Sequence, residues 1–299
     1  MAFICSLPEW GLIRASGADA QTFLHGQLTN DLLHLDADAA QWSAYCTAKG
    51  RMLAGFLLWH DGAEGYFLAT HRGLIAALVK RLSMYVLRAK VHIEDASAQF
   101  SAFGLLDGPE QPPMRASALD GNMRVGLPAV DAATRSLVWV PAGNAPMYGA
   151  ATGFSQADAT QWTRFMVRAG EAWITPATEE QFVPQMVNFD VLGGISFKKG
   201  CYPGQEIVAR AHYRGAVKRR MYRASLDAPA KPGDALFASD LNGQESGVVA
   251  LAAPDGAGGS EILAVLQIQS HDNATVRLGS AEGPLLRFAT LPYAFPDAA

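Results

Sequence analysis

The hydrophobic positions along the first half of the chain follow both helical and strand-like periodicities. A helical spacing of apolar residues predicts an amphipathic helix over 72–87, built on Leu74, Ile75, Leu78, Val79, Leu82, Tyr85 and Val86. Strand-like runs occupy 53–59 and 66–70, and the glycine-containing segment 61–65 predicts the turn that joins them. Similar runs predict strands at 90–95, 100–106, 122–127 and 136–140.

Capping residues predict two further helices. Ser16, followed three residues later by Asp19, resembles a capping box, and an apolar stripe of Phe23, Leu24 and Leu28 comes after it. Ser155 and Asp158 predict the start of the second helix, and Gly170 predicts its end.

After residue 215 the pattern changes to short strands separated by turns. Strands are expected at 220–226, 246–252, 262–267, 274–278 and 285–288. This spacing predicts a small antiparallel β-barrel or sandwich. We therefore expect an α+β protein with residues 1–214 forming one region of two interleaved subdomains and 215–299 forming a C-terminal barrel. The Gly/Pro-rich stretch 107–113 is the expected boundary inside the first region.

Composition narrows the class of protein. The 299 residues are 49% hydrophobic and 17% charged, which is typical of a globular chain. Cys5, Cys46 and Cys201 form no disulfide framework, and no CxxC or HxxxH spacing predicts a metal site. The N-terminus lacks a signal-peptide pattern, and no apolar run approaches the roughly 20 residues needed to span a membrane. We expect a cytoplasmic protein without a membrane segment.

The candidate chemistry lies at 198–206, where Cys201 stands between Gly200 and Gly204 and follows Lys198 and Lys199. Nearby cations favour the thiolate, and flanking glycines let a ligand approach the backbone. The alternative is a tight turn with a small buried cysteine. Between 198 and 223 the chain has eight basic residues and one acid, a net charge of +7, whereas the whole chain carries −4. This basic island predicts an anionic ligand, although a solvated edge strand would also explain part of it.

Several motifs in this order resemble the YgfZ family of folate-binding proteins, which is related to the aminomethyltransferase (T-protein) of the glycine cleavage system. The segment 199–206, KGCYPGQE, resembles the K-G-C-[FY]-x-G-Q-E signature of that family. The segment 23–31, FLHGQLTND, resembles its F-L-x-G-Q-x-T-x-D motif, and 48–52, AKGRM, resembles its K-G-[RK]-[MI] turn. Further matches are 168–170, 182–185, Asn188, 194–198, Arg210, Tyr213, Gly215, Lys218 and Arg219.

The resemblance implies three subdomains arranged as a cloverleaf around an opening that takes tetrahydrofolate, and a role in supporting iron–sulfur enzymes, including a tRNA-modifying one. It implies iron–sulfur enzymes or cluster-assembly proteins as partners. Cys201 and Lys199 are then the candidate catalytic residues. The candidate folate-binding residues are Gln27, Asp31, Lys49, Arg51, Arg168, Gln185, Asn188, Tyr202, Gln205, Glu206 and Arg210. The basic island would hold the polyglutamate tail of the folate.

The chain departs from the aminomethyltransferases at two acids. Those enzymes carry a pair of aspartates on a strand that corresponds here to 53–56, LAGF, and a pterin-binding glutamate where Arg168 stands. Arginine offers only hydrogen-bond donors. The donor edge of a pterin requires an acceptor such as a carboxylate. Asp190 or Glu206 would have to replace the missing acid, or the ring is bound differently.

Three functions remain open at this point. The first is a YgfZ-like folate-binding protein in which Cys201 takes part in redox or cluster chemistry. The second is a folate-dependent aminomethyltransferase, against which the missing carboxylates argue. The third is an RNA-binding module, and the net charge of −4 argues against direct nucleic-acid binding.

Two N-terminal motifs are expected at the same site. If the predicted helix continues past Gln27, then Gln27 and Asp31 share one face. Lys49 and Arg51 lie on a turn that enters a strand. The alternative is that Asp31 only caps a helix end and that Lys49 is merely solvated.

Overall fold

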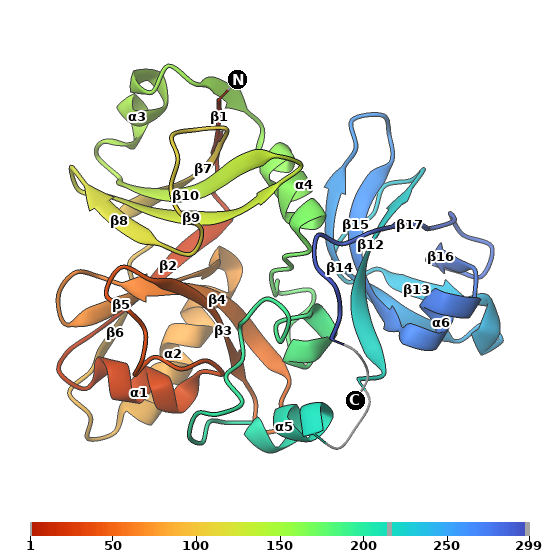
Figure 1. Cartoon of the computed structure of the whole chain (residues 1–299), viewed down its shortest axis with the longest axis horizontal. Helices are drawn as coiled ribbons and strands as arrows, with labels where there is room; N and C mark the ends of the chain where they lie inside the picture. The colour runs from red at the N-terminus through yellow and green to blue at the C-terminus, as the bar shows by residue number, and fades with distance from the viewer. Residues whose placement is uncertain (1, 214–216, 297–299) are drawn as a thin grey trace.

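The computed structural model describes residues 2–213 and 217–296, which form three sheets visible as three lobes in Figure 1. The first is a five-stranded antiparallel sheet in the order β3-β4-β5-β2-β6. Its elements are β2 (Trp10–Ser16), β3 (Ala40–Cys46), β4 (Met52–His60), β5 (Gly65–His71) and β6 (His92–Asp95), with helices α1 (Ala20–Gln27), η1 (Arg72–Leu74) and α2 (Ile75–Val86). As its spacing predicted, α2 buries Ile75, Leu78 and Leu82.

The second sheet has six strands in the order β11-β1-β7-β10-β9-β8. Its strands are β1 (Phe3–Ser6), β7 (Phe100–Leu106), β8 (Ala116–Leu119), β9 (Asn122–Val130), β10 (Ala133–Pro141) and β11 (Ser155–Ala157), and α3 (Ala145–Ala151) follows β10. Only the β1–β11 pairing among these strands is parallel. Residues 107–113 connect β7 and β8 within this one sheet.

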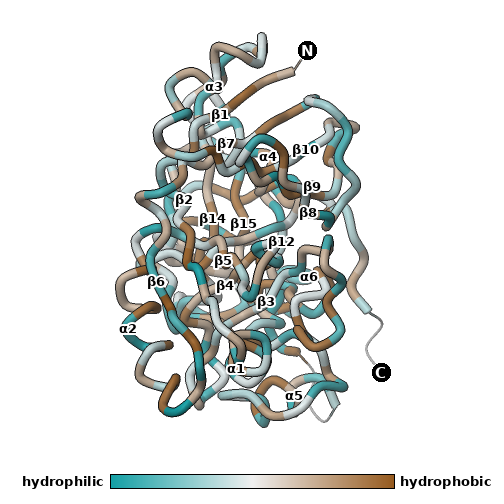
Figure 2. The backbone as a smooth tube through the Cα atoms, turned by 90° about the vertical axis from the view of Figure 1, so that its left-hand side faces the viewer, coloured by the Kyte–Doolittle hydropathy of each residue, from teal (hydrophilic) through white to brown (hydrophobic). Residues whose placement is uncertain are grey.

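A central segment connects the sheets. Helix α4 (Ala159–Ala169) begins at Asp158, whose Oδ1 accepts from Thr160 N–H at 2.7 Å, and ends at Gly170 in the left-handed conformation. Then follow η2 (Pro184–Val187) and α5 (Gln205–Tyr213). In both views, α1 and α5 lie at the same end of the molecule and α3 lies at the opposite end (Figures 1 and 2).

The third sheet is antiparallel, with the order β16-β13-β14-β15-β12-β17. It consists of β12 (Arg219–Leu226), β13 (Ala235–Ala238), β14 (Glu245–Pro254), β15 (Ser260–Gln267), β16 (Val276–Leu278) and β17 (Arg287–Ala289), together with η3 (Ser239–Leu241) and α6 (Ile268–Asn273). The prediction of strands in this region is confirmed, and so is the α+β class. Within the described part of the chain, no strand pairing joins β16 to β17 to close the sheet.

Tryptophan side chains form the junction between the first two sheets and the central segment. Trp10 lies 3.6 Å from Trp173 and 6.1 Å from Trp139 between ring centroids, and Trp59 lies 4.8 Å from Trp139. Trp42 packs near the same Trp173 ring at 6.3 Å. Large rings buried together contribute strongly to a core, so this aromatic junction stabilises the arrangement of the two sheets.

One predicted helix start is wrong, and a second is right only in part. Ser16 is the last residue of β2, and Asp19 precedes α1 without capping it because its Oδ2 accepts from Lys90 N–H at 2.7 Å. Ser155 belongs to β11, whereas Asp158, the other residue of that prediction, caps α4 as expected. In both cases a residue whose local sequence is typical of a helix N-cap instead makes a strand pairing or a backbone hydrogen bond with a distant part of the chain.

Candidate functional site

The cysteine loop, residues 198–204, lies directly before α5 and exposes a single thiol. Cys201 is exposed, whereas Cys5 and Cys46 are both fully covered. Burial raises the pKa of the Cys5 thiol to about 11 and also raises that of Cys46. Since the thiolate is the reactive form, Cys201 is the cysteine of this chain that is placed to react.

Lys199 anchors the cysteine loop to the end of α1. Its ammonium donates hydrogen bonds to the carbonyl oxygens of His25 and Leu28, the latter at 2.6 Å. These are carbonyls that a helix C-terminus leaves unpaired. The side chain is 8% exposed, and burial lowers the pKa of Lys199 to about 8. The Lys199 charge, which was expected beside the Cys201 thiolate, is thus directed at α1. Lys198, the other lysine before Cys201, is exposed.

Tyr202 and Gln205 hold the loop from the other side. The Tyr202 ring is buried, and the Lys199 Nζ atom lies 5.0 Å from its centroid. Gln205 Nε2 donates to the Gly200 carbonyl at 3.3 Å. Glu206 and Arg210 are exposed on α5. The loop backbone is therefore fixed around an accessible sulfur.

The turn at 47–50 packs against the cysteine loop. A Cβ atom at Gly204, where φ is +83°, would lie 2.5 Å from the Thr47 carbonyl oxygen, so only glycine fits there. A Cβ atom at Gly50 would in turn lie 2.9 Å from Ile207 Cβ. Lys49 is exposed on this turn, and Arg51 Nη1 donates to the Gln181 carbonyl at 2.5 Å. The turn that carries Lys49 and Arg51 thus lies beside the cysteine loop.

Gln27 and Asp31 do not share a helical face, because α1 ends at Gln27 and Leu28 is extended. Asp31 Oδ1 accepts from Leu33 N–H, and its Oδ2 lies 2.9 Å from His34 Nδ1. Burial alone would raise the pKa of Asp31, but these hydrogen bonds outweigh it and lower the pKa. Burial together with the Lys199 charge lowers the pKa of His25, which lies 3.3 Å from the same carboxylate.

Three other predicted residues hold the protein together. Gln185 is fully buried and its Nε2 donates to the Val208 carbonyl at 2.6 Å, which fixes α5. Asn188 is equally buried and donates to the Met221 carbonyl at 2.8 Å. Arg168 forms a bidentate pair with Glu261 at 2.6 and 2.9 Å, away from the cysteine loop on α4.

The basic island divides into buried and exposed residues. Arg220 pairs bidentately with Asp190 at 2.6 and 2.8 Å, and Arg223 lies 3.3 Å from a Glu261 carboxylate oxygen. Lys198, Arg210 and Lys218 are exposed. Arg214 and Gly215 lie outside the described residues. The expected boundary between the first region and the C-terminal barrel, between 214 and 215, lies there too. Asp190, one of the two acids considered for the pterin, is thus already paired.

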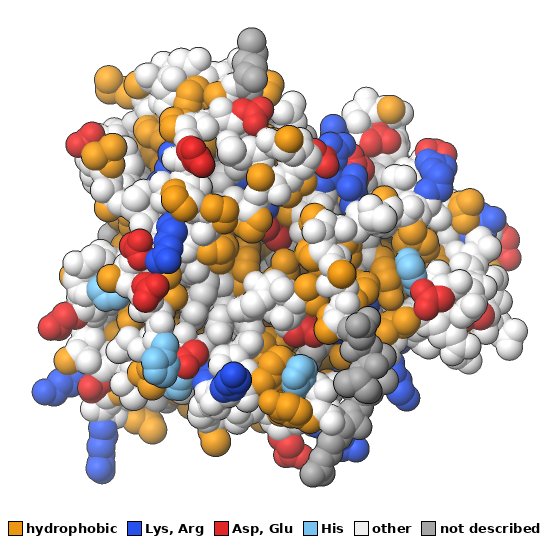
Figure 3. All heavy atoms as spheres, viewed as in Figure 1, with side chains coloured by type: hydrophobic (Ala, Val, Ile, Leu, Met, Phe, Trp, Pro, Cys, Tyr) orange, Lys and Arg blue, Asp and Glu red, His pale blue; other side chains and the backbone are white. Residues whose placement is uncertain are grey.

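Hydrophobic side chains are grouped on the surface in the region of α5 (Figure 3). The exposed large ones on this helix are Ile207 and Tyr213. His212 stacks on Phe197 at 3.8 Å between ring centroids. The helix that follows the cysteine loop therefore exposes both charged and apolar groups, a mixture that suits a protein partner.

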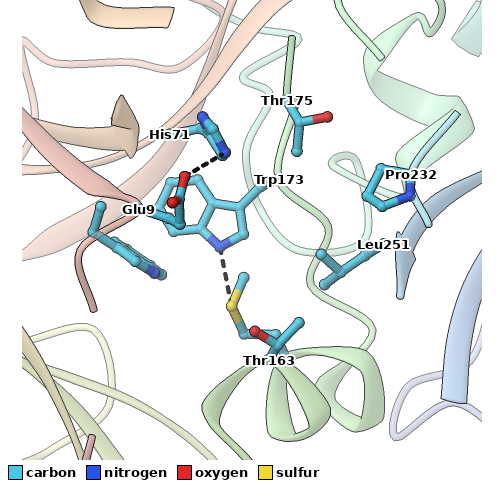
Figure 4. Close-up of a pocket in the computed structure, with 9 residues that line it drawn as sticks. Glu9, His71, Thr163, Trp173, Thr175, Pro232 and Leu251 are labelled. Atoms are coloured by element: carbon cyan, nitrogen blue, oxygen red, sulfur yellow. Dashed lines mark hydrogen bonds and ion pairs between the residues drawn. The ribbon is translucent and has the colours of Figure 1, made fainter. Parts of the chain in front are cut away.

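A cavity of about 190 Å³ lies apart from the cysteine loop, and sequence reasoning missed it. Glu9, Trp10, His71, Met166, Trp173 and Leu251 are among its lining residues, and Figure 4 shows Glu9 and His71 beside the Trp173 ring, with Leu251 farther across the space. No motif marks these residues. They come together because β2 pairs with β5, which places Trp10 opposite His71, and because α4 carries Met166 to the same point.

Alkylation distinguishes the three cysteines. We expect iodoacetamide at neutral pH to modify Cys201 alone in the folded chain, and all three cysteines in urea. Burial shields Cys5 and Cys46 and keeps them protonated. Mass spectrometry of the labelled peptides measures this, with Cys201→Ser as the control that should take up no label when folded. Labelling of Cys5 or Cys46 at the rate of Cys201 would contradict this expectation.

Two classes of feature are absent from the described chain. No helix in residues 2–213 and 217–296 is long and apolar enough to cross a membrane. Within the same ranges, no cluster of three or more His, Cys, Asp or Glu side chains is arranged to hold a metal ion.

Comparison with known proteins confirms the resemblance. No protein-family profile matches the chain. It is 32% identical over 98% of its length to the tRNA-modifying protein YgfZ of Sodalis glossinidius, covering 94% of that protein. It is 33% identical to that of Photobacterium profundum and 32% identical to that of Yersinia pestis, covering 92% and 93% of them.

The fold is similar to that of a glycine cleavage enzyme. The crystal structure of aminomethyltransferase T from Bartonella henselae superposes with a TM-score of 0.77 over 97% of this chain and 86% of that one, at 15% identity. At that identity, the likeness concerns the fold alone. Because three curated relatives are 32–33% identical to this chain over 98% of its length, the chain belongs to the YgfZ family.

Proposed function

We propose that this chain is a tetrahydrofolate-binding protein that supports the assembly or repair of iron–sulfur enzymes, including tRNA-modifying ones, with Cys201 as the reacting group. The observation that carries the proposal is that Cys201 exposes its thiol on a loop held by the hydrogen bonds of Lys199 and Gln205. The other two cysteines are buried. The relatives named tRNA-modifying protein YgfZ favour the tRNA-related part of the role. The proposed location is the cytoplasm.

The cysteine chemistry would involve a partner protein. One thiolate cannot supply the usual four cysteine ligands of an iron–sulfur cluster, so a cluster held here would need ligands from elsewhere. Cys201 would act by transient ligation or thiol exchange with a client enzyme or a cluster-assembly protein. The exposed apolar and basic groups of the loop and of α5, Ile207, Tyr213, Lys198 and Arg210, would receive that partner.

Folate binding is supported by the fold shared with aminomethyltransferase T. Reduced folates carry glutamate tails, and exposed Lys198, Arg210 and Lys218 offer cations for them. Aminomethyl transfer is the less favoured function. The segment corresponding to the catalytic aspartates lies within β4, where residues 53–56 are buried and carry no acid, and Arg168 is held by Glu261.

Calorimetry with mono- and polyglutamylated tetrahydrofolate tests the ligand. We expect both to bind, and the polyglutamate to bind about three- to tenfold more tightly, because exposed ion pairs contribute about 1 kcal/mol or less each. The double variant Lys198→Ala/Arg210→Ala should remove that advantage, whereas Lys231→Ala, which changes an exposed lysine between β12 and β13, should keep it. Equal affinities for both forms in the unmodified chain would refute the tail contacts, and no binding of either would refute the folate role.

A further inference from the structure

The C-terminal end of α2 exposes three large apolar side chains. One side of this helix packs on β2 and β6 and is buried. Met84, Tyr85 and Leu87, in contrast, are 59%, 47% and 87% exposed, and Leu87 is the most exposed large hydrophobic residue in the part of the chain that the structure describes. Single exposed apolar residues are ordinary, but three within four positions form a patch, which we call the α2 patch. Such patches mark interaction sites.

The backbone at Leu87 has a conformation that leucine rarely adopts. Ala89 N–H donates to the Val86 carbonyl at 2.8 Å, so residues 86–89 form a turn in which Leu87 is the second residue. Its φ of +47° and ψ of −103° are close to those of the first central position of a type II′ turn, where glycine predominates. A side chain with a Cβ atom is strained at that position.

Strain and exposure at one residue point to a contact outside the chain. In the free protein both cost free energy, because glycine would remove the strain and a polar residue would remove the exposed apolar surface. The Leu87 side chain gains almost no burial in return. Backbone strain of this kind persists at sites that bind ligands or partners, so a partner that covers Leu87 accounts for both features.

The α2 patch has a basic rim. Segment 72–91 contains five basic residues and no acid, although the whole chain carries −4. Lys80 lies one helical turn before Met84, Arg88 follows Leu87 directly, and both cations are exposed. Among the described residues, neither Lys80 nor Arg88 forms an ion pair. Free cations around an apolar centre are complementary to an apolar pocket with an acidic rim.

The residue types of the α2 patch favour a protein over a nucleic acid or a membrane. Single-stranded nucleic acids bind to aromatic rings on which the bases stack, but two of the three patch residues are aliphatic. A helix that binds a membrane lays its apolar stripe in the lipid, whereas the apolar stripe of α2 is buried against the first sheet. Methionine, aromatic residues and arginine are enriched in protein interfaces.

A chain of contacts links α2 to the cysteine loop. The Arg81 guanidinium lies 6.0 Å from the centre of the Tyr45 ring, and Tyr45 forms a β-bridge with Leu28. The Leu28 carbonyl accepts the hydrogen bond of Lys199 at 2.6 Å. Helix α2 lies in the same lobe as α1, and α3 lies at the far end of the molecule (Figures 1 and 2). A partner on α2 would therefore be held by the lobe that anchors the cysteine loop.

We propose that the C-terminal end of α2 docks a partner protein that presents an apolar pocket surrounded by Asp and Glu. Leu87 and Met84 fill the pocket, and Lys80 and Arg88 pair with the acids around it. The identification of this partner as an iron–sulfur enzyme or a cluster-assembly protein rests on the proposed function. The docking surface itself does not.

Photocrosslinking in a bacterium that lacks its own YgfZ protein tests the α2 patch. The full chain carries p-benzoylphenylalanine in place of Tyr85, and irradiation should join it to a protein at a peptide rich in Asp and Glu. Leu87→Gly, Met84→Gln and the double variant Lys80→Glu/Arg88→Glu should each reduce this adduct about tenfold. The matched control is Met147→Gln on α3, where an equally exposed methionine should be replaced without effect.

Thermal unfolding of Leu87→Gly measures the strain independently. Because the side chain makes few contacts, its loss should relieve the strain and raise the melting temperature by about 2 °C. A melting temperature that does not rise would show that Leu87 serves the fold, and this would overturn the proposal. Met84→Gln changes no turn residue, so its effect on the adduct does not depend on the backbone at Leu87.

The adduct separates the docking surface from the proposed function. No adduct, an adduct with RNA or lipid instead of protein, or an adduct that any of the three α2 changes leaves intact would overturn the docking surface. An adduct that all three changes reduce, formed with a protein outside iron–sulfur metabolism, would support the docking surface and refute the partner class of the proposed function. The same adduct with an iron–sulfur enzyme or a cluster-assembly protein would support both.

Discussion

Replacing Glu171 with alanine is expected to destabilise the folded chain by about 3–5 kcal/mol, because it leaves a buried arginine without its counter-charge. Arg135 on β10 donates from Nη1 and Nη2 to the two Glu171 oxygens at 3.0 and 2.7 Å. The Arg135 side chain is fully buried and that of Glu171 is 5% exposed. The third guanidinium donor, Nε, reaches the Pro128 carbonyl at 3.0 Å.

Urea denaturation measures this loss, and the double variant Arg135→Met/Glu171→Leu is its control. The double variant removes both charges, so it should lose much less stability than the sum of the two single changes. Glu282→Ala, at an exposed position, should change the free energy of unfolding by about 0.5 kcal/mol or less. A loss below about 1 kcal/mol for Glu171→Ala would mean that the pair is not desolvated as the structure shows.

This ion pair also shows how the central segment is held. Glu171 follows the Gly170 cap of α4, so the pair fixes the chain leaving that helix against the second sheet. Tyr293 reaches the same place from the C-terminal region, where its hydroxyl donates to the Gly170 carbonyl at 2.7 Å. The segment leading to η2 and the cysteine loop is thus attached to the second sheet and to the C-terminal segment that follows β17.

Local periodicity was enough to predict many elements. The apolar spacing over 72–87 corresponds to η1 and α2, and the Asp158 and Gly170 signals bound α4. Strand runs after residue 215 correspond to strands of the third sheet. Such patterns depend on neighbours a few residues apart, which a sequence shows directly.

Contacts between distant segments could not be predicted in this way. The motif residues Gln185 and Asn188 were expected at the ligand, but the structure buries them against Val208 and Met221. Lys199 stands two residues before Cys201, yet its side chain extends to the end of α1. Short spacing in sequence does not fix side-chain direction, so charge near a thiol has to be judged in three dimensions.

The cavity shows the same limit more strongly. Glu9, His71, Trp173 and Leu251 are far apart in sequence, and none belongs to a motif. Only strand pairing and the path of the central segment bring them together. The cysteine loop, in contrast, was found from its residues because glycines, lysines and a cysteine lie within one short stretch.

Replacing Cys201 with serine is expected to abolish the function of the chain in the cell while leaving its fold unchanged. The thiol is exposed, so serine creates no cavity and breaks no contact in the core. Serine keeps the size of the side chain but is a far poorer metal ligand and nucleophile at neutral pH. The matched control is Cys5→Ala, which changes a buried cysteine that the proposed chemistry does not use.

Complementation of a bacterium that lacks its own YgfZ protein tests the central claim most directly. The measurement is the activity of iron–sulfur enzymes and the level of their tRNA modification, in cells producing equal amounts of each variant. We predict that the unmodified chain and Cys5→Ala restore both, and that Cys201→Ser restores neither although its melting temperature is unchanged. Full restoration by Cys201→Ser would contradict the account, because the cysteine loop could not then be the reacting centre.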